Sequence, residues 1–274
     1  MIRFNPDGPG LLEQHTGRMT SRAGGFIPGE RVVFKGRDLH HDLHDLDWME
    51  LYVYGFTGRR FTPAQVKVLH ALWTYTSYPD ARLWNNRIAA LAGGARSTGA
   101  LGLAAALAAS EAQIYGRGVD MRAIEFLIRA AAQTTESGDL TLLIRGEIQK
   151  QRGIAGYGRP LVSVDERIPP MLKLLKEQGL DNGLHIKTAF EVERVLLAGR
   201  WRLHMNYGCL AAAVAADLGF SPREYYFFGF SSFLAGMVPC YEGAVGKPEG
   251  LTFPLPCRII AGATKKSRRW KNPE

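Results

Sequence analysis

Cysteine is scarce in this 274-residue chain, and no hydrophobic run is long. The three cysteines, Cys209, Cys240 and Cys257, are odd in number and lack the close spacing of a metal site. We therefore expect small core thiols, and neither a disulfide framework nor a zinc site. The longest apolar stretch, residues 100–109, is too short to cross a bilayer, and no signal-peptide pattern opens the sequence. These absences predict a soluble protein of the reducing cytoplasm.

Acidic residues are outnumbered by basic ones, 26 against 34, and half of the excess lies in residues 264–274. We expect this basic tail to be solvated, with contact to phosphate groups or RNA as the alternative. The remaining chain is only mildly basic and has no separate nucleic-acid signature. Hydrophobic residues make up 46% of the sequence, which excludes disorder as the main state.

The hydrophobic pattern is predominantly helical, without repeats or a low-complexity linker. Residues 31–34 predict one short strand, and Thr62 with Pro63 forms a typical helix start. Residues 99–110 and 203–218 are rich in alanine, which predicts two central buried helices. Residues 239–263 are expected to be a loop with a possible strand. Further helices are predicted near residues 46–56, 83–92, 124–135, 139–152, 168–179 and 187–197, and residues 222–237 are apolar and aromatic. The fold class is therefore all-α.

Several short motifs, weak singly, follow one another in the order found in a known family. Residues 36–39 (GRDL), 51–55 (LYVYG) and 61–65 (FTPAQ) are similar to the opening of citrate synthases and citryl-CoA lyases. Residues 95–99 (ARSTG) resemble the "ASTGA" helix start of that family. The later motifs follow in the order of the family, and they are residues 114–120 (IYGRGVD), 156–160 (GYGRP), 165–167 (DER), 204–207 (HMNY) and 247–248 (KP). The resemblance covers roughly residues 30–260 and is closest to the citryl-CoA lyase branch.

This resemblance implies a citrate synthase-like helical homodimer that binds a coenzyme A thioester. It places a small domain at residues 118–230 and a large domain at residues 1–117 and 231–274. The small domain would close over the acyl-CoA. Membrane partners are not expected.

Three catalytic positions differ from the family, whose chemistry uses two histidines and an aspartate. By motif alignment these become Tyr115, Arg159 and Asn206. An asparagine amide is not a useful base, although a tyrosine hydroxyl still donates hydrogen bonds and an arginine still binds carboxylate or phosphate. The family's later arginine also has no counterpart, because residues 230–236 read FSSFLAG. Citrate is therefore disfavoured, and a less charged or aromatic partner is expected.

Four residues are candidates for the missing proton acceptor or a nucleophile, each with a structural alternative. Asp120 follows the Tyr115 segment, where a helix cap is the alternative. His204 flanks Asn206, where a hydrogen-bonded core histidine is the alternative. Cys209 and Cys240 lack a visible activating base, so core thiols are favoured over nucleophiles.

Binding of coenzyme A is assigned to the segments that surround the nucleotide in the family. The candidates are Gly156, Gly158, Arg159, Arg167 and Lys247, with surface charge as the alternative reading of the cations. The glycine-rich turn at residues 153–158 would let the backbone approach the nucleotide. Phe227, Phe228, Phe230 and Phe233 either line an apolar pocket or belong to the core. The His40, His41 and His44 cluster is placed on a solvated helix, and no metal is expected.

Two functions remain open from the sequence. The first is an acyl-CoA-dependent carbon–carbon lyase or Claisen-type synthase with a divergent active site, including retro-Claisen cleavage of a substrate other than citrate. The second is a catalytically retired member of the family that binds a ligand or a regulatory partner.

Overall fold

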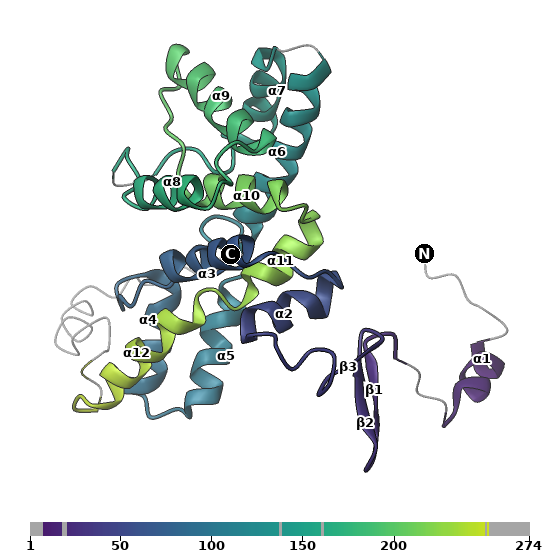
Figure 1. The fold of residues 1–274 in the computed structure, drawn as a ribbon. Coiled ribbons are helices and arrows are strands. Elements are labelled where there is room, and N and C mark those ends of the chain that lie inside the picture. Colours follow the sequence, from purple (N-terminus) through teal and green to yellow (C-terminus); the bar gives the residue numbers. More distant parts are fainter. Residues whose placement is uncertain (1–7, 18–20, 137–138, 160–161, 250, 252–274) are drawn as a thin grey trace, which may run out of the picture. The chain divides into compact units, whose positions relative to one another are not determined.

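The computed structural model describes residues 8–17, 21–136, 139–159, 162–249 and 251 (Figure 1). The basic tail, Cys257, Pro160 and the predicted strand region beyond residue 251 lie outside these residues. The described chain is almost entirely helical, so the predicted all-α class is confirmed. No helix in the described ranges combines the length and hydropathy needed to cross a membrane.

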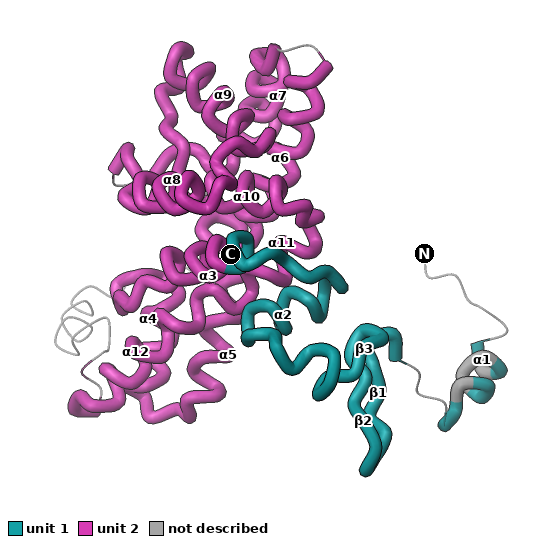
Figure 2. Tube along the Cα trace, in the orientation of Figure 1, with its two compact units in different colours: residues 1–66 teal, residues 67–274 magenta. Residues whose placement is uncertain are grey.

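The chain divides between Val66 and Lys67 into two compact units, which Figure 2 shows in teal and magenta. The first unit contains α1 (Gly8–His15), a three-stranded antiparallel sheet and α2 (Trp48–Thr57). The strands are β1 (Gly24–Ile27), β2 (Arg31–Phe34) and β3 (Arg37–Asp38), in the order β1-β2-β3. β2 coincides with the predicted strand. The predicted division at residues 118 and 230 stays a prediction.

Helix α2 has the local signals that its sequence suggests. Asp47 caps its first turn by accepting from the Glu50 N–H, and the Glu50 side chain accepts from the Asp47 N–H. Gly58 ends the helix in the left-handed conformation, at φ 70°. The predicted helix carrying the histidine cluster is wrong: residues 39–45 form consecutive turns. Asp38 stabilises these turns by accepting the N–H groups of His40 and His41.

Helix α3 (Pro63–Thr76) begins at the predicted position and continues into the second unit. Thr62 and Gln65 cap it reciprocally, each side chain accepting the other's backbone N–H.

The second unit contains two groups of packed helices. In the first group, α12 packs on α4 and α5. In the second, α6 packs on α9, α10 and α11. The helices of the unit are α4 (Trp84–Gly94), α5 (Gly99–Ala109), α6 (Arg117–Glu136), α7 (Thr141–Gln151), α8 (Ile168–Glu177), α9 (Leu184–Ala198), α10 (Tyr207–Asp217), α11 (Pro222–Phe230) and α12 (Leu234–Val245).

The two alanine-rich helices have different environments. α10 is buried along nearly its whole length, as predicted. α5 is not the predicted buried helix, because only Gly102 and Ala106 are buried in it and Leu101 is 67% exposed. Gly102 faces Ala92 and Tyr241 so closely that a Cβ would lie 2.7 Å from the Ala92 Cβ. One face of α5 is thus packed tightly while the opposite face is exposed.

The C-terminal loop prediction is also wrong for residues 239–245, which belong to α12. Proline at position 239 removes one backbone donor and suggested a helix end. Close packing holds the helix together around it: a Cβ on Gly93 of α4 would lie 2.5 Å from the Tyr241 carbonyl oxygen. The tertiary contact outweighs the local proline signal.

Candidate functional site

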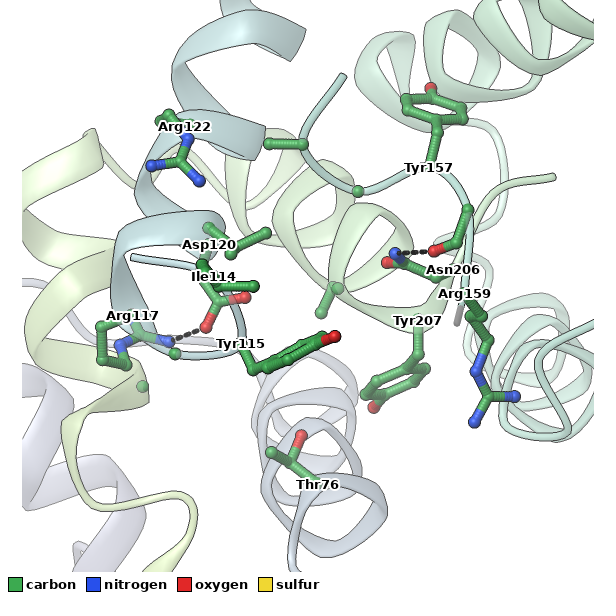
Figure 3. A pocket seen from close by; sticks show the side chains of 18 of the residues that line it. Thr76, Ile114, Tyr115, Arg117, Asp120, Arg122, Tyr157, Arg159, Asn206 and Tyr207 are labelled. Carbon is green, nitrogen blue, oxygen red and sulfur yellow. Dashed lines mark hydrogen bonds and ion pairs between the residues drawn. The ribbon is translucent and has the colours of Figure 1, made fainter. Parts of the chain in front are cut away.

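A pocket of about 660 Å³ lies within the second unit (Figure 3). Its walls come from α3, the start of α6, the glycine-rich segment after α7, residues 165–167, the start of α10, and the end of α11. Segments far apart in sequence therefore meet at one cavity. Of the predicted site residues, the pocket is lined by Tyr115, Asp120, Gly156, Gly158, Arg159, Arg167 and Asn206.

Tyr115 reaches the pocket from a tight loop before α6. The loop folds back on itself, because the Arg117 N–H donates to the Ser110 carbonyl over 2.9 Å. Gly116 is needed there, since a Cβ would lie 2.2 Å from the same Ser110 oxygen. Tyr115 is 61% exposed, and Figure 3 shows its side chain at the pocket that Asp120 and Tyr207 also line. Its hydroxyl is therefore accessible as a hydrogen-bond donor.

Arg117 and Asp120 form an ion pair in the first turns of α6. The Arg117 Nη1 lies 2.5 Å from the Asp120 Oδ2, and the arginine side chain is only 4% exposed. Its Nη2 donates to the carbonyls of Tyr225 (2.7 Å) and Tyr226 (3.1 Å) in α11. Burial raises the pKa of Asp120, and the charges of Arg117 and Arg167 only partly oppose this. Asp120 is thus an ion-paired pocket carboxylate and does not cap a helix.

Asn206 is the N-cap of α10. Because of this cap the helix begins at Tyr207, four residues after the predicted start at residue 203. The Asn206 Oδ1 accepts the Cys209 N–H over 3.3 Å, and its Nδ2 donates to the Gly158 carbonyl over 3.0 Å. Each atom retains one further hydrogen-bonding position, because an amide oxygen has two lone pairs and an NH₂ has two protons. The residue therefore combines a structural role with exposure to the pocket.

The glycine-rich segment packs against α10. Gly156 has φ 92° and Gly158 has φ 86°. A Cβ on Gly156 would lie 2.6 Å from the Cys209 Cβ, and the Asn206 N–H donates to the Gly156 carbonyl over 2.9 Å. Close approach to α10 therefore explains Gly156 without any nucleotide.

Arg159 and Arg167 are held by internal carboxylates. Arg167 makes a two-pronged contact with Asp165, at 2.8 Å to each oxygen, and its guanidinium lies over the Tyr207 ring at 4.6 Å. Arg159 donates to Glu166 over 2.6 Å, which lowers the pKa of Glu166 to about 2. These arginines are therefore positioned by the fold before any ligand binds.

Arg122 and Arg152 also line the pocket and were missed by sequence reasoning. Arg122 donates only to Gln113, and neither guanidinium has a carboxylate partner within the described ranges. Arg152 ends α7 in the left-handed conformation, at φ 59°. Their position beside the motif segments was the available signal. Together with the paired arginines they make the pocket suited to an anionic ligand.

Other predicted residues lie outside the pocket. His204 contacts Glu193, with Nδ1 3.3 Å from Oε1, and its side chain is 39% exposed, so it is not the core histidine given as the alternative. Lys247 follows α12, where its carbonyl accepts from Arg96. Cys209 is fully buried, which raises the pKa of its thiol to about 12, and burial also raises the pKa of Cys240. Both thiols are neutral at physiological pH, as expected of core cysteines.

The predicted phenylalanines divide into two pairs. Phe228 and Phe233 line the pocket together with Leu72 and Trp73 of α3, which gives it an apolar wall. Phe227 and Phe230 are each 38% exposed and do not line it. Among the described residues, no three histidine, cysteine, aspartate or glutamate side chains are grouped to hold a metal ion.

Comparison with solved structures places this architecture among known folds. The chain is similar to citryl-CoA lyase from Hydrogenobacter thermophilus, with a TM-score of 0.76 and 15% identity over 94% of this chain and 96% of that one. It is also similar to ATP citrate lyase from Methanothrix soehngenii in complex with citrate and coenzyme A, with a TM-score of 0.64 and 17% identity over 89% of this chain and 41% of that one.

A third similar structure is the citrate synthase from Thermoplasma acidophilum, with a TM-score of 0.58 and 17% identity over 77% of this chain and 56% of that one. The sequence itself matches no protein-family model. No curated protein matches it either. The fold predicted from the motifs is thus confirmed, and the chain has the fold shared by citryl-CoA lyase and citrate synthase.

Proposed function

We propose that this protein makes or breaks a carbon–carbon bond beside a coenzyme A thioester, as a citryl-CoA lyase-like lyase or a Claisen-type synthase. One observation carries the proposal. Tyr115, Arg159 and Asn206, which match the family's catalytic positions, come from three distant segments and line the same pocket. The similar ATP citrate lyase structures contain coenzyme A in one case and (3S)-citryl-CoA in the other.

Each of the three residues has a role that its chemistry permits. The Tyr115 hydroxyl donates a hydrogen bond to the thioester oxygen, where negative charge develops in the enolate. Arg159 orients an anionic group of the substrate, since Glu166 already fixes its guanidinium. The remaining Asn206 amide positions hold the partner carbonyl, or a water molecule in a retro-Claisen cleavage.

The substrate is proposed to be less charged than citrate. One wall of the pocket is formed by Leu72, Trp73, Phe228 and Phe233. Residues 230–236, where the family has a substrate-binding arginine, contain none. Such a wall favours an apolar or aromatic partner of the thioester. Arg122 and Arg152, which lack carboxylate partners among the described residues, are proposed to attract the phosphates of coenzyme A, together with Arg159, Arg167 and the backbone at Gly156 and Gly158. Lys247 is the weakest of the predicted contacts, because it does not line the pocket.

The proposal is tested by titrating the protein with coenzyme A, acetyl-CoA and longer or aromatic acyl-CoAs in a thermal-shift assay and by calorimetry. A bound ligand raises the melting temperature by mass action. We expect a saturable increase that is weakened by Arg152→Glu. Lys173→Glu on α8, whose side chain is 80% exposed, is the matched charge-reversal control. No shift with any acyl-CoA would contradict the assignment.

A retired enzyme is the second candidate, and the use of Asn206 as a helix cap favours it. Reversion by Tyr115→His, Arg159→His and Asn206→Asp separates the two. Citryl-CoA cleavage gained by the revertant, with no activity of the natural protein on any acyl-CoA, would support retirement. Activity of the natural protein that is lost on reversion would support the enzyme.

A further inference from the structure

We propose that Asp120 is the proton acceptor of this site, in place of the carboxylate that residue 206 lacks. The proposal rests on the proposed thioester chemistry and names the residue that performs its proton transfer. Enolate formation beside a thioester needs a base, and asparagine cannot supply one. Among the acidic residues of the described chain, the pocket is lined by Asp120 and Asp165 alone.

Asp165 is not available for this role. Its side chain is fully buried, and it accepts two hydrogen bonds from the Arg167 guanidinium and one from the Arg167 N–H. It also accepts the Tyr207 N–H over 2.8 Å. Burial alone would raise the pKa of Asp165, but these contacts outweigh it and hold the pKa below its usual value. A carboxylate bound in this way is a weak base.

Asp120 lies beside the atoms of Asn206 that face the pocket. The point at which Gly208 would carry a Cβ is 3.2 Å from the Asn206 Oδ1 and 3.5 Å from the Asp120 Oδ1. Both oxygens therefore face the same small space at the first turn of α10. Glycine at 208 keeps this space open for a substrate atom.

Arg117 fixes Asp120 and leaves one carboxylate oxygen for the reaction. It binds the Oδ2, while the Oδ1 has no hydrogen-bond partner among the described residues. The Asp120 side chain is 20% exposed, so the pocket reaches it. A carboxylate held through one oxygen presents the other in a constant orientation.

The surroundings of Asp120 suit a base. Arg117 from its own helix and Arg167 from the 165–167 segment favour the ionised form, and Tyr225 of α11 lies nearby as a neutral group. Burial raises the pKa of Asp120 overall. A raised pKa strengthens the base, and the ion pair with Arg117 favours its charged form.

One residue completes the reversible reaction in this arrangement. In cleavage of a 3-hydroxyacyl thioester, Asp120 takes the hydroxyl proton, the bond between carbons 2 and 3 breaks, and its electron pair forms the enolate. The hydroxyl carbon becomes a carbonyl, and carbon 2 recovers the proton from the Asp120 carboxyl group. No water and no redox partner is consumed. Synthesis follows the same steps in reverse.

The test measures proton transfer without knowledge of the carbonyl partner. Acetyl-CoA, propionyl-CoA and phenylacetyl-CoA are incubated with the protein in D₂O, and deuterium at carbon 2 is followed by mass spectrometry. We expect exchange with the natural protein and a decrease of about 100-fold or more in Asp120→Asn, with unchanged acyl-CoA affinity. Glu125→Gln, an exposed change on the same helix, is the control and keeps the natural rate.

Exchange by Asp120→Asn within a few-fold of the natural rate would overturn the proposal, as would coenzyme A binding without any exchange by the natural protein. Absence of coenzyme A binding would overturn the proposed function itself. If Asp120→Asn does not fold, the pH profile of the natural protein decides. Exchange that rises with pH and levels off once a single group of carboxyl pKa is ionised supports Asp120, and a flat profile contradicts it.

Discussion

At the scale of single residues, the site is built from ions that already have partners. Arg117, Arg159 and Arg167 each contact a carboxylate of their own segment. Such pairs fix the direction of a guanidinium at little further cost in side-chain entropy when a ligand arrives. The pocket is therefore preorganised, and its charged groups also affect the stability of the folded chain.

Asp165 gives the clearest expectation for stability against pH. Its folded-state pKa lies below the unfolded value, so its contribution is present above about pH 4 and is lost as the pH falls further. Asp165→Asn leaves the partly buried Arg167 without its anion and is expected to be less stable than the natural protein at pH 7. The difference in the free energy of unfolding between the natural protein and Asp165→Asn, measured by urea unfolding, should become smaller as the pH is lowered from 5 to 3.

The matched control for this prediction is Glu125→Gln, which replaces an exposed carboxylate on α6. Its difference from the natural protein should stay small throughout. If the free energy of unfolding of Asp165→Asn differs from that of the natural protein by a constant amount from pH 7 to pH 3, the lost interaction does not depend on ionisation.

At the scale of elements, the pocket depends on how closely the glycine-rich segment approaches α10. Gly156 combines a positive φ of 92° with a Cβ position 2.6 Å from the Cys209 Cβ. Both features penalise any side chain there. The segment carries Arg159 and accepts from Asn206, so its position affects two of the three proposed catalytic residues.

Gly156→Ala is expected to lower the free energy of unfolding by about 2 kcal/mol or more, through left-handed strain and overpacking. The control is Gly146→Ala in α7, where a Cβ would contact nothing within 4 Å. That change should stabilise the protein by about 0.5–1 kcal/mol, because alanine favours a helix interior. Equal effects in thermal or urea unfolding would contradict the packing argument.

At the scale of the whole molecule, the exposed face of α5 offers a surface for the homodimer that the family resemblance implies. Ala100, Leu101, Ala104, Ala105 and Ala108 are exposed on a helix without a charged residue. Contiguous apolar surface of this kind is typical of protein interfaces. The sequence predicted burial of this helix, and a second subunit would provide it.

Leu101→Glu is expected to convert a dimer of the natural protein into a monomer, because it places a charge on that face. Light scattering after size-exclusion chromatography measures the mass. Leu142→Glu on α7, where the leucine is 77% exposed, serves as the control and should leave the dimer intact. A natural protein that is monomeric at high concentration, or a dimeric Leu101→Glu, would reject this face.

Local signals in the sequence predicted some helix starts well, such as those of α3 and α8, but α6 begins at Arg117, well before the predicted residue 124, and burial was predicted less well. Thr62 and the strand at residues 31–34 act as the sequence indicates, because caps and strands of this length depend on neighbouring residues. Pro239 within α12 and the exposed face of α5 could not be predicted, because packing between distant segments decides both.

The candidate site was predictable only in part. Ordered motifs identified the segments that meet at the pocket, since the fold brings them together. Arg117 and Asp120 are only three positions apart, but the contact of Arg117 with the Tyr225 carbonyl of α11 joins residues more than a hundred positions apart and leaves no local pattern. Arg122 and Arg152 were missed although both lie beside the motif segments in sequence.

Gly229 of α11 lies directly against the guanidinium of Arg117. A Cβ at this position would lie 2.1 Å from the Arg117 Nη1, the nitrogen that binds Asp120. Even a methyl group at the end of α11 must therefore displace the guanidinium and release the carboxylate it restrains. A natural substitution of Gly229, which has no reactive atom of its own, would therefore act first by changing the acidity of the Asp120 carboxyl group in the pocket.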